Sequence, residues 1–327
     1  MATGGSNKAV IAALLANTGI ALTKFIAFLL TGFSSMLAES IHSLADSSNQ
    51  ALLLIGGKRS EREATEEHPF GYGRERYIYA FIVSIVLFSV GGVFALYEAY
   101  HKFHEIHAGH GDDLFDSSWR YVPLFVLGIA IVLEGLSFRT AIVEGNKVRG
   151  NQTWWSYIRR AKSPELPVIL LEDFAALIGL VVAFVAVSLA LITSNAYFDV
   201  GGTAIIGVLL VIVAVILSIE VKSLLIGESA TRDSIAKIRG AIESTDGVTQ
   251  IIHLKTLHIG PEELLVAAKI GVDAATSAAE VVAVIDAAER NLRAADPMAQ
   301  QVFLEPDVFR ADYVPDERPD VPAAPSH

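Results

Sequence analysis

Long apolar runs, each bounded by charged or turn residues, follow one another along the first part of the chain. A helix that crosses a bilayer needs about 20 mostly apolar residues, at a rise of about 1.5 Å per residue. Six runs fit this pattern: Ala9–Leu30, Ser35–Ile55, Tyr77–Tyr97, Val122–Phe138, Pro167–Ile192 and Val200–Ile226. The pattern therefore predicts a polytopic α-helical membrane protein with a six-helix transmembrane bundle.

The pattern changes after the sixth run. Two stretches then place apolar residues at helical spacing, and three shorter stretches have the alternating or apolar pattern of strands. In chain order these stretches centre on Ile238, Thr249–Leu257, Val266–Asp273, Val284 and Val302–Leu304. The order helix, strand, strand, helix, strand predicts a small cytoplasmic α+β domain of ferredoxin-like type.

These patterns divide the chain into four parts. Residues 1–7 are expected to be a flexible N-terminus, residues 8–227 the six-span transmembrane domain, and residues 228–307 the cytoplasmic α+β domain. Residues 308–327 are rich in proline and acidic residues and carry too little apolar surface to order themselves, so we expect a disordered tail. The first apolar run lacks the features of a cleaved signal peptide, so we expect it to remain in the mature protein.

Composition supports a membrane protein and excludes some partners. Of the 327 residues, 52% are hydrophobic and only 19% are charged, and the mean hydropathy is +0.47. The net charge of −11 argues against a nucleic-acid partner, because phosphate binding requires a basic surface. The chain has no cysteine, so a metal site must use nitrogen and oxygen ligands.

Basic residues gather on one side of the predicted bundle. The connections after the second and fourth runs hold Lys58, Arg59, Arg62, Arg74, Arg76, Arg139, Lys147, Arg149, Arg159, Arg160 and Lys162. Cytoplasmic connections are enriched in Lys and Arg, so we expect both connections to face the cytoplasm. The even number of spans then places both termini in the cytoplasm, in a multi-pass protein of the plasma (inner) membrane.

The second and fifth runs carry ionisable residues that must face the bundle interior rather than lipid. His42 and Asp46 are four residues apart, so they project from one face of a helix and can bind one ion together. An imidazole and a carboxylate suit zinc and neighbouring transition metals better than calcium. Asp173 is the acid of the fifth run, and its neighbour Glu172 points about 100° away around the helix. The alternative is that His42 and Asp46 only stabilise their own helix.

Three further features have open interpretations. Glu39 precedes His42 on the same stripe and is either an entry carboxylate or a solvated helix end. Glu134 in the fourth run is either a relay or an interfacial group. A group of histidines outside the third run either collects metal or lies on a solvated loop; its members are His101, His104, His107 and His110.

The motifs around these residues resemble the cation diffusion facilitator family of metal transporters. The second run reads Leu-Ala-Glu-Ser-Ile-His-Ser-Leu-Ala-Asp from Leu37 to Asp46, which is similar to the second-span signature of that family. Other similar segments are His-Pro-Phe-Gly-Tyr-Gly at His68–Gly73 and Leu-Leu-Ile-Gly at Leu224–Gly227. The Leu-Glu-Asp-Phe-Ala-Ala segment looks most like the branch that contains the animal mitochondrial zinc transporter. The resemblance implies a homodimer that exports divalent metal in exchange for protons.

The chain also departs from the family pattern. Where the family's fifth span has His or Asp, four residues before the last aspartate, this chain has Ile169. Water, Glu172 or Asn17 of the first run is left to complete the site. The family's second metal site keeps only His68, with Thr65 and Tyr72 in the other positions, so we expect that site to be lost. In the cytoplasmic domain only His253 and His258 remain, so we do not expect a binuclear site there.

The sequence thus predicts a secondary-active zinc exporter that works by metal/proton antiport through alternating access. Its substrates are the metal ion and protons, and no cofactor is required. Iron, manganese or cobalt is the alternative substrate, and a membrane metal sensor without flux is the alternative function. An intramembrane enzyme is not expected, because the chain has no His-Glu-x-x-His arrangement.

Overall fold

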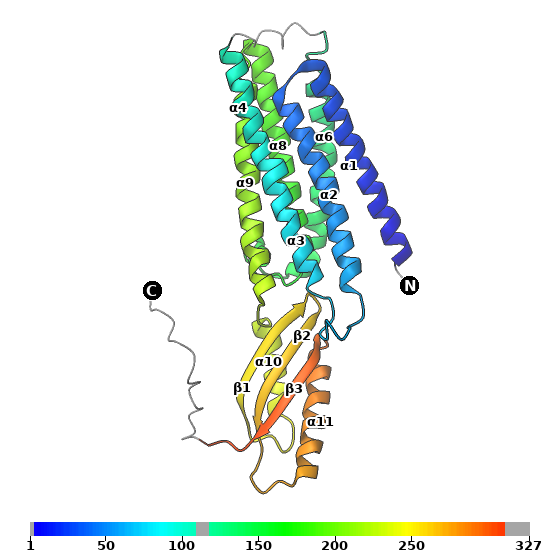
Figure 1. The fold of residues 1–327 in the computed structure, drawn as a ribbon, viewed down its shortest axis with the longest axis vertical. Coiled ribbons are helices and arrows are strands. Elements are labelled where there is room, and N and C mark those ends of the chain that lie inside the picture. Colours follow the sequence, from blue (N-terminus) through cyan, green and yellow to red (C-terminus); the bar gives the residue numbers. More distant parts are fainter. Residues whose placement is uncertain (1–2, 109–117, 311–327) are drawn as a thin grey trace. The chain divides into compact units, whose positions relative to one another are not determined.

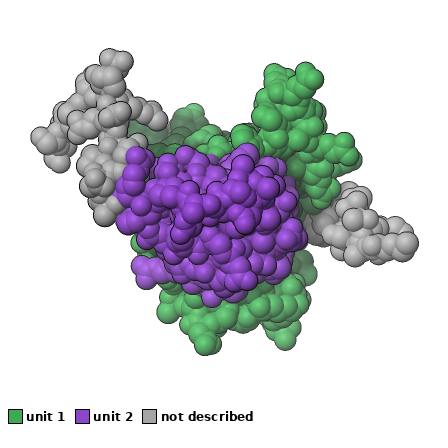
Figure 2. All heavy atoms as spheres, turned by 90° about the horizontal axis from the view of Figure 1, so that it is seen from below, with its two compact units in different colours: residues 1–228, 258–262 green, residues 229–257, 263–327 purple. Residues whose placement is uncertain are grey.

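The computed structural model describes residues 3–108 and 118–310, with side chains described from residue 17 onward. The chain divides into two compact units, residues 1–228 with 258–262 and residues 229–257 with 263–327 (Figure 2). His110 of the predicted histidine group lies outside the described residues, as does the predicted tail from residue 311 onward. The first helix begins at Thr3, inside the segment expected to be a flexible terminus, because a membrane helix can extend into water beyond its apolar part.

In the described part of the first unit, six long helical segments alternate in direction (Figure 1). They are α1 (Thr3–Thr31), α2 (Ser34–Ser60), the continuous α3 (Glu75–Val86), η1 (Leu87–Val93) and α4 (Phe94–His107), α6 (Val122–Arg149), α8 (Glu165–Thr193) and α9 (Tyr197–Ile226). Each predicted apolar run falls within one of these segments. A short helix that the pattern did not predict, α7 (Trp154–Arg160), lies in the connection before α8.

Within the described residues, four of these segments are long and apolar enough to cross a membrane: α3 through α4, α6, α8 and α9. The described apolar part of α1, Asn17–Thr31, is shorter, and α2 is interrupted by polar and ionisable residues. Together with the small α+β unit that follows, these helices confirm the predicted fold class.

The bundle has an apolar interior and an apolar outer surface. Large side chains such as Phe33, Met36 and Leu210 are fully buried between the helices. On α6, by contrast, Phe125, Ile129, Val132, Leu133 and Leu136 are exposed and recur at helical spacing. An exposed apolar stripe of this kind is suited to contact with lipid.

The third segment contains a π-helical stretch, η1, where it passes α9. Gly91 and Gly92 lie in η1 and are buried. A Cβ atom on Gly92 would lie 2.7 Å from Cγ2 of Val211, and one on Gly207 of α9 would lie 2.8 Å from Cγ of Leu96. The two segments therefore approach each other closely only because glycine stands on both sides of the contact.

The second unit contains α10 (Arg232–Glu243), most of β1 (Gln250–Gly260), β2 (Glu263–Gly271), α11 (Ala278–Ala295) and β3 (Ala299–Asp307). The predicted order of helices and strands is therefore confirmed. The sheet has the order β1-β2-β3, and β2 and β3 pair in parallel, joined by the crossover through α11. The apolar core combines one face of each helix with the sheet and includes Ile238, Ile242, Leu264, Ile270 and Leu292.

Helix α11 begins with a capping box. The Ser277 backbone N–H donates to Glu280 Oε2 at 2.8 Å, and the Glu280 backbone N–H donates to Ser277 Oγ at 3.4 Å. Hydrogen bonds from the backbone and side chain of Ser277 lower the pKa of the Glu280 carboxyl. The charged form of Glu280 therefore stabilises the start of this helix.

One predicted loop is helical in the structure. The sequence pattern placed His101, His104 and His107 in a connection, but α4 continues through His107. The helix continues because His101 and Lys102 pair with Glu105 along one side and aromatic rings stack at helical spacing, as with Phe103 and His107. The three imidazoles are exposed on this helical end.

Replacing Gly207 with alanine is expected to destabilise the bundle. The new methyl group would lie 3.0 Å from the backbone nitrogen of Leu96, so α4 and α9 would have to separate. We expect a loss of about 1–3 kcal/mol in the free energy of unfolding, seen as a lower Tm of the purified protein in detergent. Gly201→Ala on the same helix is the matched control, because a Cβ atom there meets nothing within 4 Å. Equal melting of the two variants would contradict the close approach.

Candidate metal site

Helix α2 is the most polar of the long helices, and its start is held by a carboxylate from another helix. The N-cap residue Phe33 offers no side-chain acceptor. Instead Asp199, fully buried at the start of α9, accepts from the backbone N–H of Ser34 at 2.8 Å and from its hydroxyl at 2.9 Å. The hydroxyl of Ser35 also donates to Asp199. Asp199 thus accepts hydrogen bonds from the free N–H groups at the start of α2. These bonds fix the position of α2 along its axis relative to α9.

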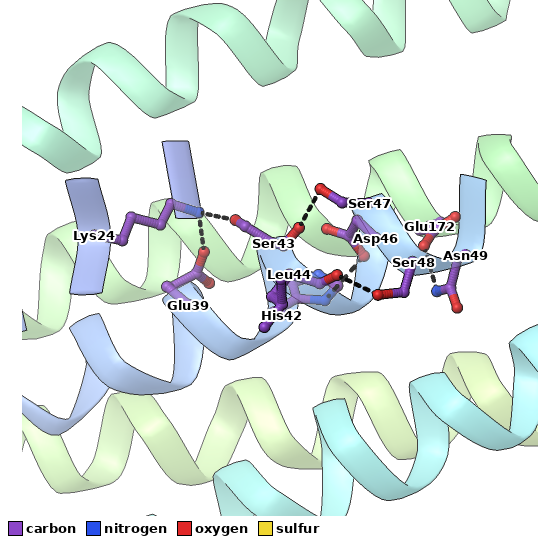
Figure 3. Close-up of polar contacts among 10 residues, drawn as sticks. All are labelled: Lys24, Glu39, His42, Ser43, Leu44, Asp46, Ser47, Ser48, Asn49 and Glu172. Atoms are coloured by element: carbon purple, nitrogen blue, oxygen red, sulfur yellow. Dashed lines mark hydrogen bonds and ion pairs between the residues drawn. The ribbon is translucent and has the colours of Figure 1, made fainter. Parts of the chain in front are cut away.

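His42 and Asp46 form a pair in the middle of α2 (Figure 3). His42 Nδ1 lies 3.2 Å from Asp46 Oδ1, and the His42 side chain is 1% exposed. Among the described residues, His42 Nε2 has no hydrogen-bond partner. A buried imidazole nitrogen with no partner is available to bind a metal ion.

Glu172 on α8 lies beside this pair. Its Oε1 accepts a hydrogen bond from Asn49 Nδ2 of α2 at 2.7 Å, and its carboxyl group contacts that of Asp46. The Glu172 side chain is buried. Asn49 therefore directs Glu172 toward α2, and three potential ligands, His42, Asp46 and Glu172, follow one another along the interface between α2 and α8 (Figure 3).

Asp173 is turned toward a different helix. It accepts a hydrogen bond from Ser137 of α6 at 3.0 Å, and its charge interacts with that of Glu134, also on α6. The charge of Glu134 also acts on Asp46. The two neighbouring acids of α8 thus face different partners, as the angle of about 100° between consecutive residues requires.

Glu39 is fully buried and is therefore not a solvated helix end. It pairs with Lys24 of α1, whose Nζ lies 3.0 Å from Glu39 Oε2 and 2.7 Å from Ser43 Oγ (Figure 3). Sequence reasoning did not single out Lys24, Asn49 or Ser137. The one available signal was that Lys24 is a charge within an apolar run; nothing in the pattern marked Asn49 or Ser137.

The structure brings some of the predicted ligands together and leaves others apart. In the described part of the chain, no group of three or more His, Asp or Glu side chains is arranged to hold a metal ion. Asp46 contacts both His42 and Glu172, whereas Asp173 contacts Ser137 instead. The ligand set stays a prediction, and rotation of the acidic side chains would be needed to complete it.

The other two sites considered from the sequence have the following contacts. Thr65 Oγ1 and the Tyr72 hydroxyl lie 3.2 Å apart, and the Thr65 hydroxyl accepts the His68 backbone N–H at 3.1 Å. His253 is exposed, whereas His258 is buried with Nδ1 3.3 Å from the carbonyl oxygen of Gly260. The loss of the metal site around His68 and of the one in the cytoplasmic domain stays a prediction. The contacts described above are compatible with it.

The fold and the buried groups define a class of protein. It is a multi-pass α-helical membrane protein, followed by a small α+β unit, that keeps a row of ionisable side chains inside its bundle. Charged groups at such positions are costly in a membrane protein and are typical of pathways for ions.

Family comparisons identify the class more closely. A model of the cation efflux transmembrane domain matches residues 10–226, and a model of the cation efflux protein cytoplasmic domain matches residues 230–307. The chain belongs to the cation efflux (cation diffusion facilitator) family, a family of transporters and not of enzymes. This confirms the resemblance inferred from the motifs.

Curated relatives agree with this assignment. The chain is 29% identical over 272 residues to the proton-coupled zinc antiporter SLC30A9, mitochondrial, of Mus musculus, a match that covers 82% of this chain and 46% of the relative. It is 28% identical over 258 residues to metal tolerance protein C4 of Arabidopsis thaliana, covering 78% of this chain and 55% of that protein. The chain thus spans about half the length of these relatives.

The second unit is also similar to solved domains. The C-terminal domain of MamM, in a nickel form, matches with 18% sequence identity and a TM-score of 0.24, covering 24% of this chain and 100% of that domain. Magnetosome protein MamM of Paramagnetospirillum magneticum is 29% identical over 125 residues, covering 38% of this chain and 36% of that protein.

Replacing Asn49 with alanine is expected to weaken metal binding. Glu172 would lose the donor that holds it toward Asp46, so the site would be less well arranged before the ion arrives. We expect the Kd for Zn²⁺ to rise by about tenfold, measured by calorimetry on the purified protein. Ser48→Ala is the control, because the exposed Ser48 hydroxyl bonds only to the Leu44 carbonyl at 3.0 Å. An unchanged Kd for Asn49→Ala would contradict this positioning role of Asn49.

Proposed function

We propose that this protein is a secondary-active transporter that exports divalent metal ions, zinc above all, in exchange for protons. The observation that carries the proposal is the contact between the carboxyl groups of Asp46 and Glu172, beside the buried imidazole of His42. Two carboxylates in contact inside a bundle repel each other, and a proton or a divalent cation relieves that repulsion. The same site is therefore suited to hold either a metal ion or a proton.

Competition between these two occupants couples their movements. A metal ion binds imidazole and carboxylate groups only in their deprotonated forms, so binding of metal releases protons and binding of protons releases metal. If the site opens alternately to each side of the membrane, a proton gradient drives metal the other way. Asp173, next to Glu172 on α8, and Glu134 on α6 interact with each other beside the pair, where they are placed to pass protons or to join the ligands.

The chemistry of the ligands favours zinc. One imidazole nitrogen and carboxylate oxygens form a tetrahedral set that zinc accepts readily, with water in a remaining position. Relatives named as proton-coupled zinc antiporters support this substrate. The absence of a second nitrogen ligand at Ile169 leaves iron, manganese and cobalt as the alternative substrates, since these ions accept oxygen-rich sites.

The proposal extends to assembly and location. Residues 230–307 match the family's cytoplasmic domain, called ZT_dimer, which supports a homodimer. Basic residues in the connections formed by residues 61–74 and 150–164 favour a cytoplasmic position for that side of the membrane and for both termini. We place the protein in the plasma (inner) membrane on this basis; the curated relatives named above include mitochondrial proteins.

Flux measurements in vesicles test the transporter. Purified full-length protein is reconstituted with a pH-sensitive dye inside, and Zn²⁺, Mn²⁺, Fe²⁺ or Co²⁺ is added outside. We expect zinc to drive proton movement, and Asp46→Asn or Glu172→Gln to reduce the rate by about tenfold or more, because each removes a negatively charged ligand. Glu220→Gln is the control, since Glu220 pairs with the exposed Arg159 at 3.2 Å and is not one of the proposed ligands.

Each other result of the flux measurement has a definite meaning. Loss of flux in Asp173→Asn but not in Glu172→Gln would assign the site to His42, Asp46 and Asp173. Metal binding without flux for any ion would contradict transport and favour a membrane sensor, in which the site controls the cytoplasmic unit.

A further inference from the structure

A lysine on α1 places its ammonium group inside the bundle rather than at the membrane surface. The Lys24 side chain is 3% exposed, and both of its hydrogen-bond acceptors, Glu39 and Ser43, belong to α2 (Figure 3). Its neighbours Leu22, Phe25 and Ile26 are exposed apolar residues, as lipid contact requires. A lysine near a helix end usually extends toward water, but Lys24 instead reaches across to a fully buried carboxylate.

This ion pair lies directly beside the candidate metal site. Glu39 precedes His42 by three residues, which is about 4.5 Å along the helix axis, and Ser43 follows His42. The charge of Lys24 acts on His42, on Asp46 and on Glu134. A fixed positive charge at this position opposes the arrival of a divalent cation.

Glu39 has an unused oxygen. Its Oε2 binds Lys24, but its buried Oε1 has no hydrogen-bond partner among the described residues. That oxygen faces Gly179 of α8, where a Cβ atom would lie only 2.9 Å away. The Glu39 carboxylate therefore lies between α1, α2 and α8. Its Oε1 faces α8 and has no hydrogen-bond partner among the described residues, so it is available to bind a metal ion.

From these contacts we propose that Lys24 is a tethered cation that competes with the transported metal for Glu39. While it is paired with Glu39, the ammonium group neutralises that carboxylate and lowers the metal affinity of the neighbouring His42 site. When Lys24 moves away, Glu39 becomes a further ligand at that end of the site. Lys24 thus sets the net charge of the metal site. This inference rests on one part of the proposed function, the binding of a divalent metal at that site.

A structural brace between α1 and α2 is the competing interpretation of the pair. The two differ in how single and double substitutions behave. Removal of either partner of a brace weakens the fold in the same direction, since it leaves an unpaired buried charge. A competing cation instead gives shifts in metal affinity of opposite sign, because one substitution leaves a free anion at the site and the other a free cation.

The test measures the Kd for Zn²⁺, and for Co²⁺ by its visible spectrum, on purified full-length protein. We expect Lys24→Met to bind metal about tenfold more tightly or better, and Glu39→Gln to bind about tenfold more weakly. We expect the double variant K24M/E39Q to return to within about threefold of the original Kd, because the net charge of the pair is then unchanged. Lys102→Met is the matched control; it removes a lysine that pairs with Glu105 at 3.2 Å on α4, and it should leave the Kd unchanged.

Shifts of the same sign in both single variants, or no shift in either, would overturn the proposal. If Lys24→Met does not yield folded protein, Glu39→Gln and the double variant are compared directly, since they differ only at residue 24. Tighter binding by the double variant supports the tethered cation, and equal binding contradicts it. Failure of the proposed function shows separately, as absence of metal binding or of flux in the unaltered protein.

Discussion

A charged group in the middle of a membrane bundle must find a partner within the protein, and this requirement organises the helices around α2. Every ionisable side chain of its middle part lies against another charge or a polar group. Lys24 of α1 neutralises Glu39, and Glu172 of α8 contacts Asp46. At its start, Asp199 of α9 binds the backbone and hydroxyl of Ser34. Polar contacts therefore place α2 more specifically than apolar packing alone, since apolar contacts with lipid and with other helices differ little in energy.

The same contacts explain how a site can be both stable and responsive. A buried carboxylate is costly alone, and in the proposed site each acid would have one partner that is fixed in the fold and one position for an ion. Asn49 holds one oxygen of Glu172, while in the proposed function the contact with Asp46 responds to protons and metal. Ser137 does the same for Asp173. In the proposed exchange of one cation for another, hydrogen bonds from uncharged side chains would thus keep the acids in place.

Apolar pattern was sufficient to predict most of the fold. The six runs and the order of elements in the second unit follow from hydrophobic spacing, because burial in lipid or in a small core imposes a regular period on the sequence. The pattern could place His42 and Asp46 on one face, since both belong to one helix. It could not assign partners between helices. The pairing of Lys24 with Glu39, and the separation of Glu172 from Asp173, depend on how each helix is rotated against its neighbours.

The π-helical stretch Leu87–Val93 was also invisible to the pattern, because a periodicity of 3.6 residues over a long run hides one local irregularity. A π-helical turn accommodates one residue more than an α-helical turn of similar height. The span can therefore gain or lose a single residue at this point while both of its ends keep their positions. In evolutionary terms we therefore expect η1 to tolerate the insertion or deletion of one residue. A comparison of family members should thus allow a one-residue gap there, where a gap in a transmembrane helix would ordinarily be rejected.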